Sequence, residues 1–189
     1  MKKEQKVKKG SKRARRKALK EMLEDIALIL FVVIVVLILQ NYIIVNAQIP
    51  SGSMETTIMT GDRVFGNRLA YKDESPQRGD IVIFKYPDNE KELFIKRVIG
   101  LPGEKIEIID GLVYINDSEE PLEEPYLTVT PVGDFGPYEV PEGHYFMLGD
   151  NRNLSKDSRV WKNPYVAEKK ILAKAVFRYF PFDVMGPIE

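Results

Sequence analysis

An uninterrupted apolar run near the amino terminus is the feature that most constrains this chain. Residues 26–39, IALILFVVIVVLIL, contain no polar side chain, and the apolar character continues through QNYIIV to Val45. Twenty helical residues at about 1.5 Å each extend about 30 Å, the thickness of the hydrocarbon core of a bilayer. The run therefore predicts one transmembrane anchor over residues 26–45.

Charge is divided unevenly around this run. Residues 1–25 carry eleven Lys and Arg against four Asp and Glu, a net charge of +7, and the other 164 residues carry 17 basic and 24 acidic side chains, a net charge of −7. Basic residues before a span place the amino terminus in the cytoplasm. We therefore expect a body exported across the cell membrane and a basic tail, residues 1–25, that contacts anionic membrane lipid. A basic tail also suits nucleic acid, but the span makes a nucleic-acid partner improbable.

A removable signal peptide is the competing interpretation of the same run. Val45 and Ala47 place small residues at positions −3 and −1 of a cut after Ala47. The apolar run is longer than the usual 7–15 residues of such peptides, and this length favours an uncleaved anchor. Cleavage here would release a soluble body, so the alternative stays open.

Composition narrows the chemistry that the body can perform. The chain has no cysteine, which excludes disulfides, thiol nucleophiles and thiolate metal sites. Its single histidine, His144, makes an imidazole-rich zinc site improbable. A metal site built from carboxylates alone stays open on composition.

The body reads as mainly β. Short apolar runs such as DIVIFKY and LFIKRVIG alternate with turn signals, and the pair Asp110-Gly111 between IEII and LVYI predicts a hairpin. Twelve prolines and thirteen glycines interrupt strands more readily than helices. Only residues 163–175 offer a partial helical pattern. Residues 117–140, with four prolines and a cluster of acids, indicate a loop-rich excursion.

Lys96 is a candidate general base. On a strand its side chain shares a face with Phe94 and Val98, and such apolar neighbours keep water from the amine. Desolvation lowers a lysine pKa, and a fall of about 3 units from about 10.4 would let Lys96 act as a base near neutrality. The alternative is a lysine whose stem packs on the sheet while its amine reaches water.

Ser53 lies in IPSGSM, directly after the apolar run. A serine hydroxyl is a weak nucleophile until a base removes its proton. A Ser-His-Asp triad would have to use His144, and the alternative is an ordinary polar turn.

A third stretch, GDNRNLSKDSRVW at residues 149–161, alternates in charge after the apolar strand YFML. Such runs are usually solvated surface loops, but this position also suits ion pairs that brace a site. The charged residues concerned are Asp150, Arg152, Asp157 and Arg159.

Together, in this order behind an anchor, these stretches resemble the type I bacterial signal peptidases, the membrane-bound Ser/Lys leader peptidases. The similarity covers residues 49–181 and includes four motifs in register: IPSGSM, RGDIVIFKYP, FIKRVIGLPGE and GDNRNLSKDSR. It implies an antiparallel β catalytic core, residues 46–105 and 141–189, with a smaller inserted β domain, residues 106–140.

The resemblance also implies roles for particular residues. Ser53 would be the nucleophile and Lys96 the general base, and Ser51 Oγ with the Ser53 backbone N–H would form the oxyanion hole. Ser155 would orient the Lys96 amine. Structural support would come from Asp150, Arg152, Asp157 and Arg159.

The implied activity is removal of signal peptides from secretory preproteins by cleavage after small residues at −1 and −3. The implied Ser/Lys mechanism requires no metal and no organic cofactor. Ile49, Met54 and Ile95 flank the dyad and are the expected lining of the substrate pockets. A peptidase for a few dedicated substrates, a catalytically silent assembly protein of the same fold and a DNA-binding Ser/Lys autoprotease are the alternatives. The chain departs from the family pattern at Thr56, Asn153, Leu154 and Lys162.

Overall fold

The computed structural model describes residues 2–188, without the side chains of residues 2–16 and 18. The chain forms two compact units, one that ends at Asn41 and one that begins at Tyr42. The second unit holds every β-strand that the structure describes.

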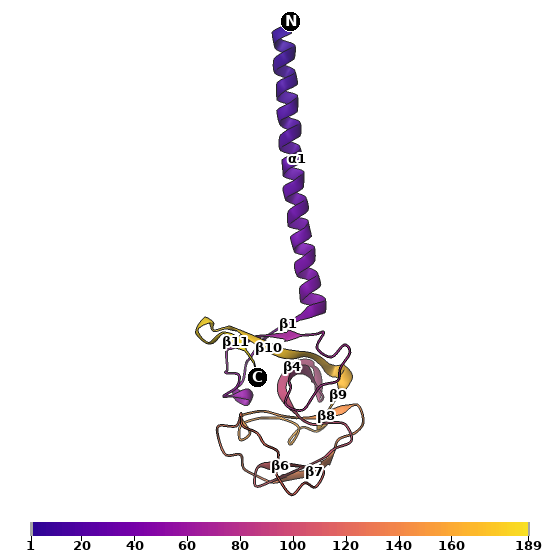
Figure 1. Cartoon of the computed structure of the whole chain (residues 1–189), viewed down its shortest axis with the longest axis vertical. Coiled ribbons are helices and arrows are strands. Elements are labelled where there is room, and N and C mark those ends of the chain that lie inside the picture. Colours follow the sequence, from indigo (N-terminus) through magenta and orange to yellow (C-terminus); the bar gives the residue numbers. More distant parts are fainter. Residues whose placement is uncertain (1, 189) are drawn as a thin grey trace. The chain divides into compact units, whose positions relative to one another are not determined.

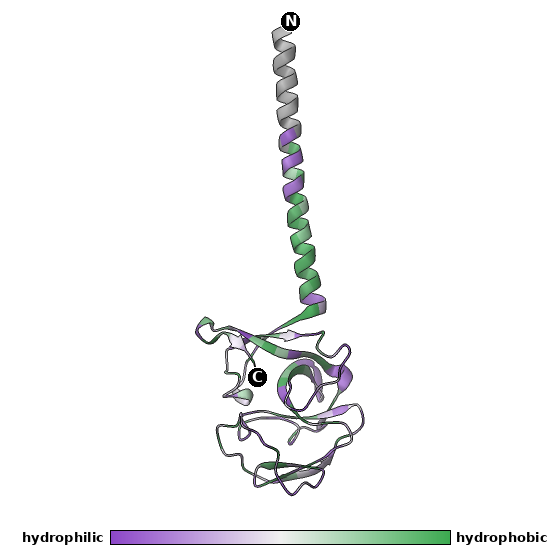
Figure 2. Cartoon of the chain, viewed as in Figure 1, coloured by the Kyte–Doolittle hydropathy of each residue, from purple (hydrophilic) through white to green (hydrophobic). Residues whose placement is uncertain are grey.

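The first unit consists of a long helix, α1 (Lys2–Ile38), and the start of a π-helical turn, Leu39–Ile43, whose last two residues belong to the second unit (Figure 1). The 25-residue segment Leu19–Ile43 contains a stretch of 18 residues with a mean hydropathy of 3.0 (Figure 2), and none of that stretch is buried against protein within the described residues. A helix that is apolar on all sides and this long suits the interior of a bilayer. The helix is therefore consistent with membrane anchoring. The helical conformation ends at Ile43, and Ile44 and Val45 begin a strand.

The main sheet of the second unit is antiparallel throughout, in the order β1-β2-β10-β3-β4-β8-β9, with β11 beside β10. Its strands are β1 (Ile44–Gln48), β2 (Arg63–Asn67), β3 (Ile81–Tyr86), β4 (Asn89–Gly100), β8 (His144–Leu148), β9 (Tyr165–Ala167), β10 (Ile171–Phe180) and β11 (Gly186–Pro187).

A second sheet has three antiparallel strands in the order β6-β5-β7: β5 (Lys105–Ile109), β6 (Leu112–Ile115) and β7 (Phe135–Glu139). The pairing of Ile109 with Leu112 leaves Asp110 and Gly111 as a two-residue turn, both at positive φ. This is the backbone geometry for which Asp-Gly is favoured, so the predicted hairpin is confirmed.

Buried side chains connect the two sheets. One cluster joins Ile99 and Phe146 of the main sheet to Ile106 and Val113 of the smaller one. Two other clusters of buried side chains contain residues of the main sheet, and they include Met54 and Trp161 respectively. The predicted mainly β class with one amino-terminal apolar helix is confirmed.

The partial helical pattern over residues 163–175 does not correspond to an α-helix in the structure. These residues form β9, a short 3-10 turn (Glu168–Lys170) and the start of β10. β10 pairs with β2 and with β3, so pairing on both edges overrides a weak helical preference.

Candidate active site

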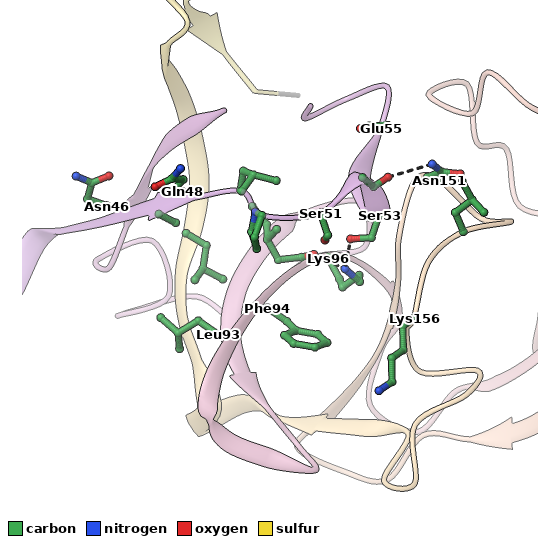
Figure 3. A pocket seen from close by; sticks show the side chains of 17 residues that line it. Asn46, Gln48, Ser51, Ser53, Glu55, Leu93, Phe94, Lys96, Asn151 and Lys156 are labelled. Atoms are coloured by element: carbon green, nitrogen blue, oxygen red, sulfur yellow. Dashed lines mark hydrogen bonds between the residues drawn. The ribbon is translucent and has the colours of Figure 1, made fainter. Parts of the chain in front are cut away.

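Ser53 lies on a single 3-10 turn, Gly52–Met54, which follows β1. A separate loop holds this turn at two points. The side-chain amide of Asn151 donates to the Gly52 carbonyl oxygen (3.0 Å), as Figure 3 shows, and the Asn151 backbone N–H donates to the Ser53 carbonyl oxygen (3.1 Å). The Ser53 hydroxyl is thus carried on backbone fixed by a residue 98 positions later.

Lys96 comes from β4, at a position paired with Val82 of β3. Its Nζ lies 2.5 Å from Ser53 Oγ, and it also donates to the carbonyl oxygen of Ile95 at 2.9 Å (Figure 3). Only 3% of Lys96 is exposed. The alternative of an amine that reaches into water is therefore wrong.

Burial lowers the pKa of Lys96 to about 8, from an ordinary value near 10.5. The carboxylates of Asp157 and Asp150 act in the opposite direction, because negative charge favours the protonated amine. The Phe94 ring, centred 5.5 Å from Nζ, is one of the apolar groups around it. Lys96 is therefore neutral in a substantial fraction of molecules near pH 8. A neutral amine at this distance can accept the proton of the Ser53 hydroxyl.

A cavity of about 620 Å³ opens beside this pair (Figure 3). Ser51, Ser53 and Lys96 line it together. Ile49 and Ile95 also line it, as expected, with Ile83 and Leu93. Met54 does not line the cavity: it is fully buried in a core cluster formed with residues of β1, β2, β3, β4 and β10. The 3-10 turn explains this correction, because it directs Ser53 and Met54 to different sides of the chain.

Ser155 lies close to the same turn. Its Oγ is buried and has no hydrogen-bond partner within the described part of the chain. A Cβ built on Gly149 would lie 2.2 Å from Ser155 Oγ and 2.3 Å from the Ser53 carbonyl oxygen. Gly149 is thus required for the two serines to approach each other. The expected bond from Ser155 to Lys96 is not formed in this structure and stays a prediction.

The alternating charges of the 149–161 loop form buried ion pairs. Asp157 accepts two hydrogen bonds from Arg159, and both side chains are at least 94% buried. Asp150 pairs with Arg97 of β4, and Arg152 pairs with Glu124 of the excursion. These four charged side chains are therefore buried in ion pairs that connect the loop to its surroundings, as one alternative expected, although other residues of the loop, such as Leu154, are exposed.

Sequence reasoning missed Asn151, Gly149 and Arg97. Asn151 and Gly149 lie within the motif at 149–159, but an amide and a glycine do not by themselves indicate the contacts they make. Arg97 follows Lys96 and points to the opposite face of β4, toward Asp150. His144, the alternative base, begins β8, is hydrogen-bonded through Nδ1 to the Glu142 carbonyl and does not line the cavity.

Two of the departures from the family pattern contact the excursion. Thr56 Oγ1 is 3.5 Å from Thr128 Oγ1, and Asn153 bonds to the carbonyl of Thr130 and to the N–H of Val132. Among the residues that the structure describes, no group of three or more Asp, Glu or His side chains is arranged to hold a metal ion.

The family described as signal peptidase, peptidase S26, matches residues 22–180. The probable signal peptidase I-2 of Synechocystis sp. is 37% identical over 159 residues, which cover 82% of this chain and 71% of that protein. Signal peptidase I of Leptolyngbya laminosa is 37% identical over 179 residues, 91% of this chain and 86% of that protein. A crystal structure of a signal peptidase I from Enterococcus faecalis is 36% identical, with a TM-score of 0.46, and covers 53% of this chain and 97% of its own.

Proposed function

This chain belongs to the signal peptidase family, peptidase S26, and we propose that it is a membrane-anchored Ser/Lys endopeptidase that removes signal peptides from secretory preproteins. The observation that carries the proposal is the 2.5 Å approach of a buried Lys96 amine to the Ser53 hydroxyl. An activated serine needs an adjacent base, and this base has a pKa lowered to about 8 by burial.

In the proposed reaction neutral Lys96 accepts the Ser53 proton as Ser53 Oγ attacks the carbonyl carbon of the residue before the cut. The scissile C–N bond breaks, the amine of the mature protein leaves with a proton from Lys96, and an ester joins Ser53 to the signal peptide. Water, deprotonated by Lys96, then hydrolyses this ester. Ser51 Oγ and the Ser53 N–H are the proposed donors to the oxyanion, and Ser155 is proposed to orient the amine.

The shape of the cavity supports cleavage after small residues. Ile49, Ile83 and Ile95 form part of its apolar wall beside Ser53, and we propose that their branched side chains limit the size of the substrate residues that fit there. β1 is an edge strand of the main sheet, so an extended signal peptide can add to it and direct alternate side chains at this wall. Positions −1 and −3 of the substrate would then face Ile49 and Ile95.

We place the anchor in the cytoplasmic membrane, with the basic tail inside the cell in contact with lipid and the body outside. Residues 106–140, which contain nearly all of the three-stranded sheet, are the proposed smaller inserted region, and residues 46–105 and 141–189 are the proposed catalytic core. No step of the reaction calls on a metal, an organic cofactor or nucleic acid.

The test is cleavage of labelled preproteins by the detergent-solubilised full chain, with the cut located by mass spectrometry. We expect a single cut after a small residue in several unrelated preproteins, and no cut by Ser53→Ala. Cleavage of only one preprotein would indicate the narrow-range peptidase. Activity retained by Ser53→Ala, or none in the wild type, would contradict the proposal.

A further inference from the structure

Four glutamates lie close together in the sequence of the excursion, at positions 119, 120, 123 and 124, and only one of them is buried in an ion pair. Glu119, Glu120 and Glu123 are exposed residues, whereas the side chain of Glu124 is only 5% exposed. Both of its oxygens accept hydrogen bonds from the guanidinium of Arg152, one of them at 2.7 Å. A buried carboxylate needs such a partner, because an unpaired charge is very costly to bury.

Tyr126 completes this contact from the same segment. Its hydroxyl donates to Glu124 (2.6 Å), and its ring lies under the guanidinium of Arg97, 3.8 Å from the ring centroid. Glu124 and Tyr126 therefore hold two arginines at once. One is in the loop that carries Ser155, and the other is next to Lys96 in β4.

The contact continues from Arg152 toward Ser53. Arg152 Nε donates to the Gly149 carbonyl (3.2 Å), which fixes the start of the loop, and Arg152 follows Asn151 directly in the chain. Asn151 in turn makes the two hydrogen bonds that hold the Gly52–Met54 turn. A displacement of Arg152 would therefore displace the support of the Ser53 backbone.

A second set of contacts, independent of these charges, ties the same segment to both loops. The hydroxyl contact from Thr128 to Thr56 reaches the chain just after the Ser53 turn. The Asn153 bonds to Thr130 and Val132 reach the 149–155 loop. Residues 124–132 thus touch both of the loops that meet at the cavity.

We propose that Glu124, supported by Tyr126, is a positioning residue of the active site: through Arg152 it fixes the loop whose Asn151 holds Ser53 against Lys96. This inference rests on the proposed function. A misplacement of reacting groups by about 1 Å can cost about 10²-fold in rate, so loss of this contact is expected to lower kcat rather than substrate binding.

The test compares Glu124→Gln with two matched controls in the full chain in detergent. Glu123→Gln changes an exposed neighbour. Glu104→Gln changes another glutamate that accepts two hydrogen bonds from an arginine, Arg78. Neither Glu104 nor Arg78 lines the cavity. For Glu124→Gln we expect kcat on a labelled preprotein to fall about 10- to 100-fold with KM within about twofold, and for both controls kcat within about twofold of wild type.

Because Glu124→Gln leaves Arg152 buried and unpaired, the double variant Glu124→Leu/Arg152→Met is measured beside it. Apolar replacement of a buried pair often preserves stability. Methionine cannot donate to Gly149, so we expect the double variant to unfold at about the wild-type temperature and to keep the low kcat. Recovery of kcat in the double variant, or wild-type kcat in Glu124→Gln, would overturn the inference. Neither of these two results would contradict the proposed function, provided that the wild type cleaves the preprotein and Ser53→Ala does not.

Discussion

Arg97, the residue after Lys96 in β4, forms a buried ion pair with Asp150 through two hydrogen bonds. Arg97 Nε donates to Asp150 Oδ1 at 2.9 Å and Nη2 donates to Oδ2 at 2.7 Å, and the two side chains are 5% and 1% exposed. The Asp150 carboxylate raises the pKa of Lys96, and Arg97 offsets its charge. The pair therefore bears on both the stability of the body and the protonation of the amine.

Replacement of Arg97 by methionine should show both effects. It leaves Asp150 buried without its cation, and loss of one partner of a buried pair typically costs about 3–5 kcal/mol of unfolding free energy. The fluorescence of Trp161, the single tryptophan and a buried one, reports urea unfolding. The uncompensated carboxylate should also raise the Lys96 pKa, so that any remaining activity requires a higher pH. An unfolding free energy equal to that of the wild type would contradict this account of the pair.

Gly149→Ala should lower activity while the body stays folded. The new Cβ would lie 2.2 Å from Ser155 Oγ and 2.3 Å from the Ser53 carbonyl oxygen, so both serines must shift. We expect kcat to fall about 10²-fold, as for other small misplacements at a reacting centre. Gly186→Ala is the control, because a Cβ there meets no atom within 4 Å. Equal kcat for the two variants would show that the close approach at Gly149 has no bearing on the reaction.

Ser155→Ala separates a role in the reaction from a role in the fold. The buried Ser155 hydroxyl has no hydrogen-bond partner within residues 2–188, so its removal breaks no bond of the resting structure. We expect the unfolding free energy to change by less than about 1 kcal/mol, or to rise, whereas kcat falls if the hydroxyl orients Lys96 during the reaction. A kcat close to that of the wild type would refute the predicted bond between Ser155 and Lys96.

Activity should rise with pH between about 7 and 9. Below its pKa of about 8 the Lys96 amine is protonated and cannot accept the Ser53 proton, and above it the neutral base predominates. Lys96→Arg should be inactive over this whole range, because a guanidinium stays protonated. The profile of kcat/KM against pH is the measurement. An inflection near 6.5 instead would point to His144 as the base.

Local signals account for the parts of the fold that the sequence predicts well. The Asp110-Gly111 hairpin depends on the backbone preference of two adjacent residues, so it can be read without knowledge of the rest of the chain. The apolar character of residues 26–39 likewise needs no tertiary contact. For Lys96 the neighbours on its strand favour a desolvated amine but leave open one that reaches water, and the 3% exposure decides for the first.

Other features depend on tertiary contacts that local patterns do not contain. Glu124 cannot be told from Glu123 by composition, because only the position of Arg152 in the folded body makes one of them a buried partner. The direction of Met54 depends on the 3-10 turn, which a strand or helix period does not describe. The pairing of Arg97 with Asp150 joins residues 53 positions apart, and the charge pattern alone offers several other partners.

The ionisation of the Lys96 amine tests the central claim most directly. In full-length protein with ¹³C at the lysine ε-carbons, NMR titration follows each amine separately, and the signal absent from Lys96→Met identifies this one. We expect a midpoint near 8 for Lys96, well below the ordinary lysine value of about 10.4. A midpoint near the ordinary value of about 10.4 would leave Ser53 without a neutral base at physiological pH and would contradict the account.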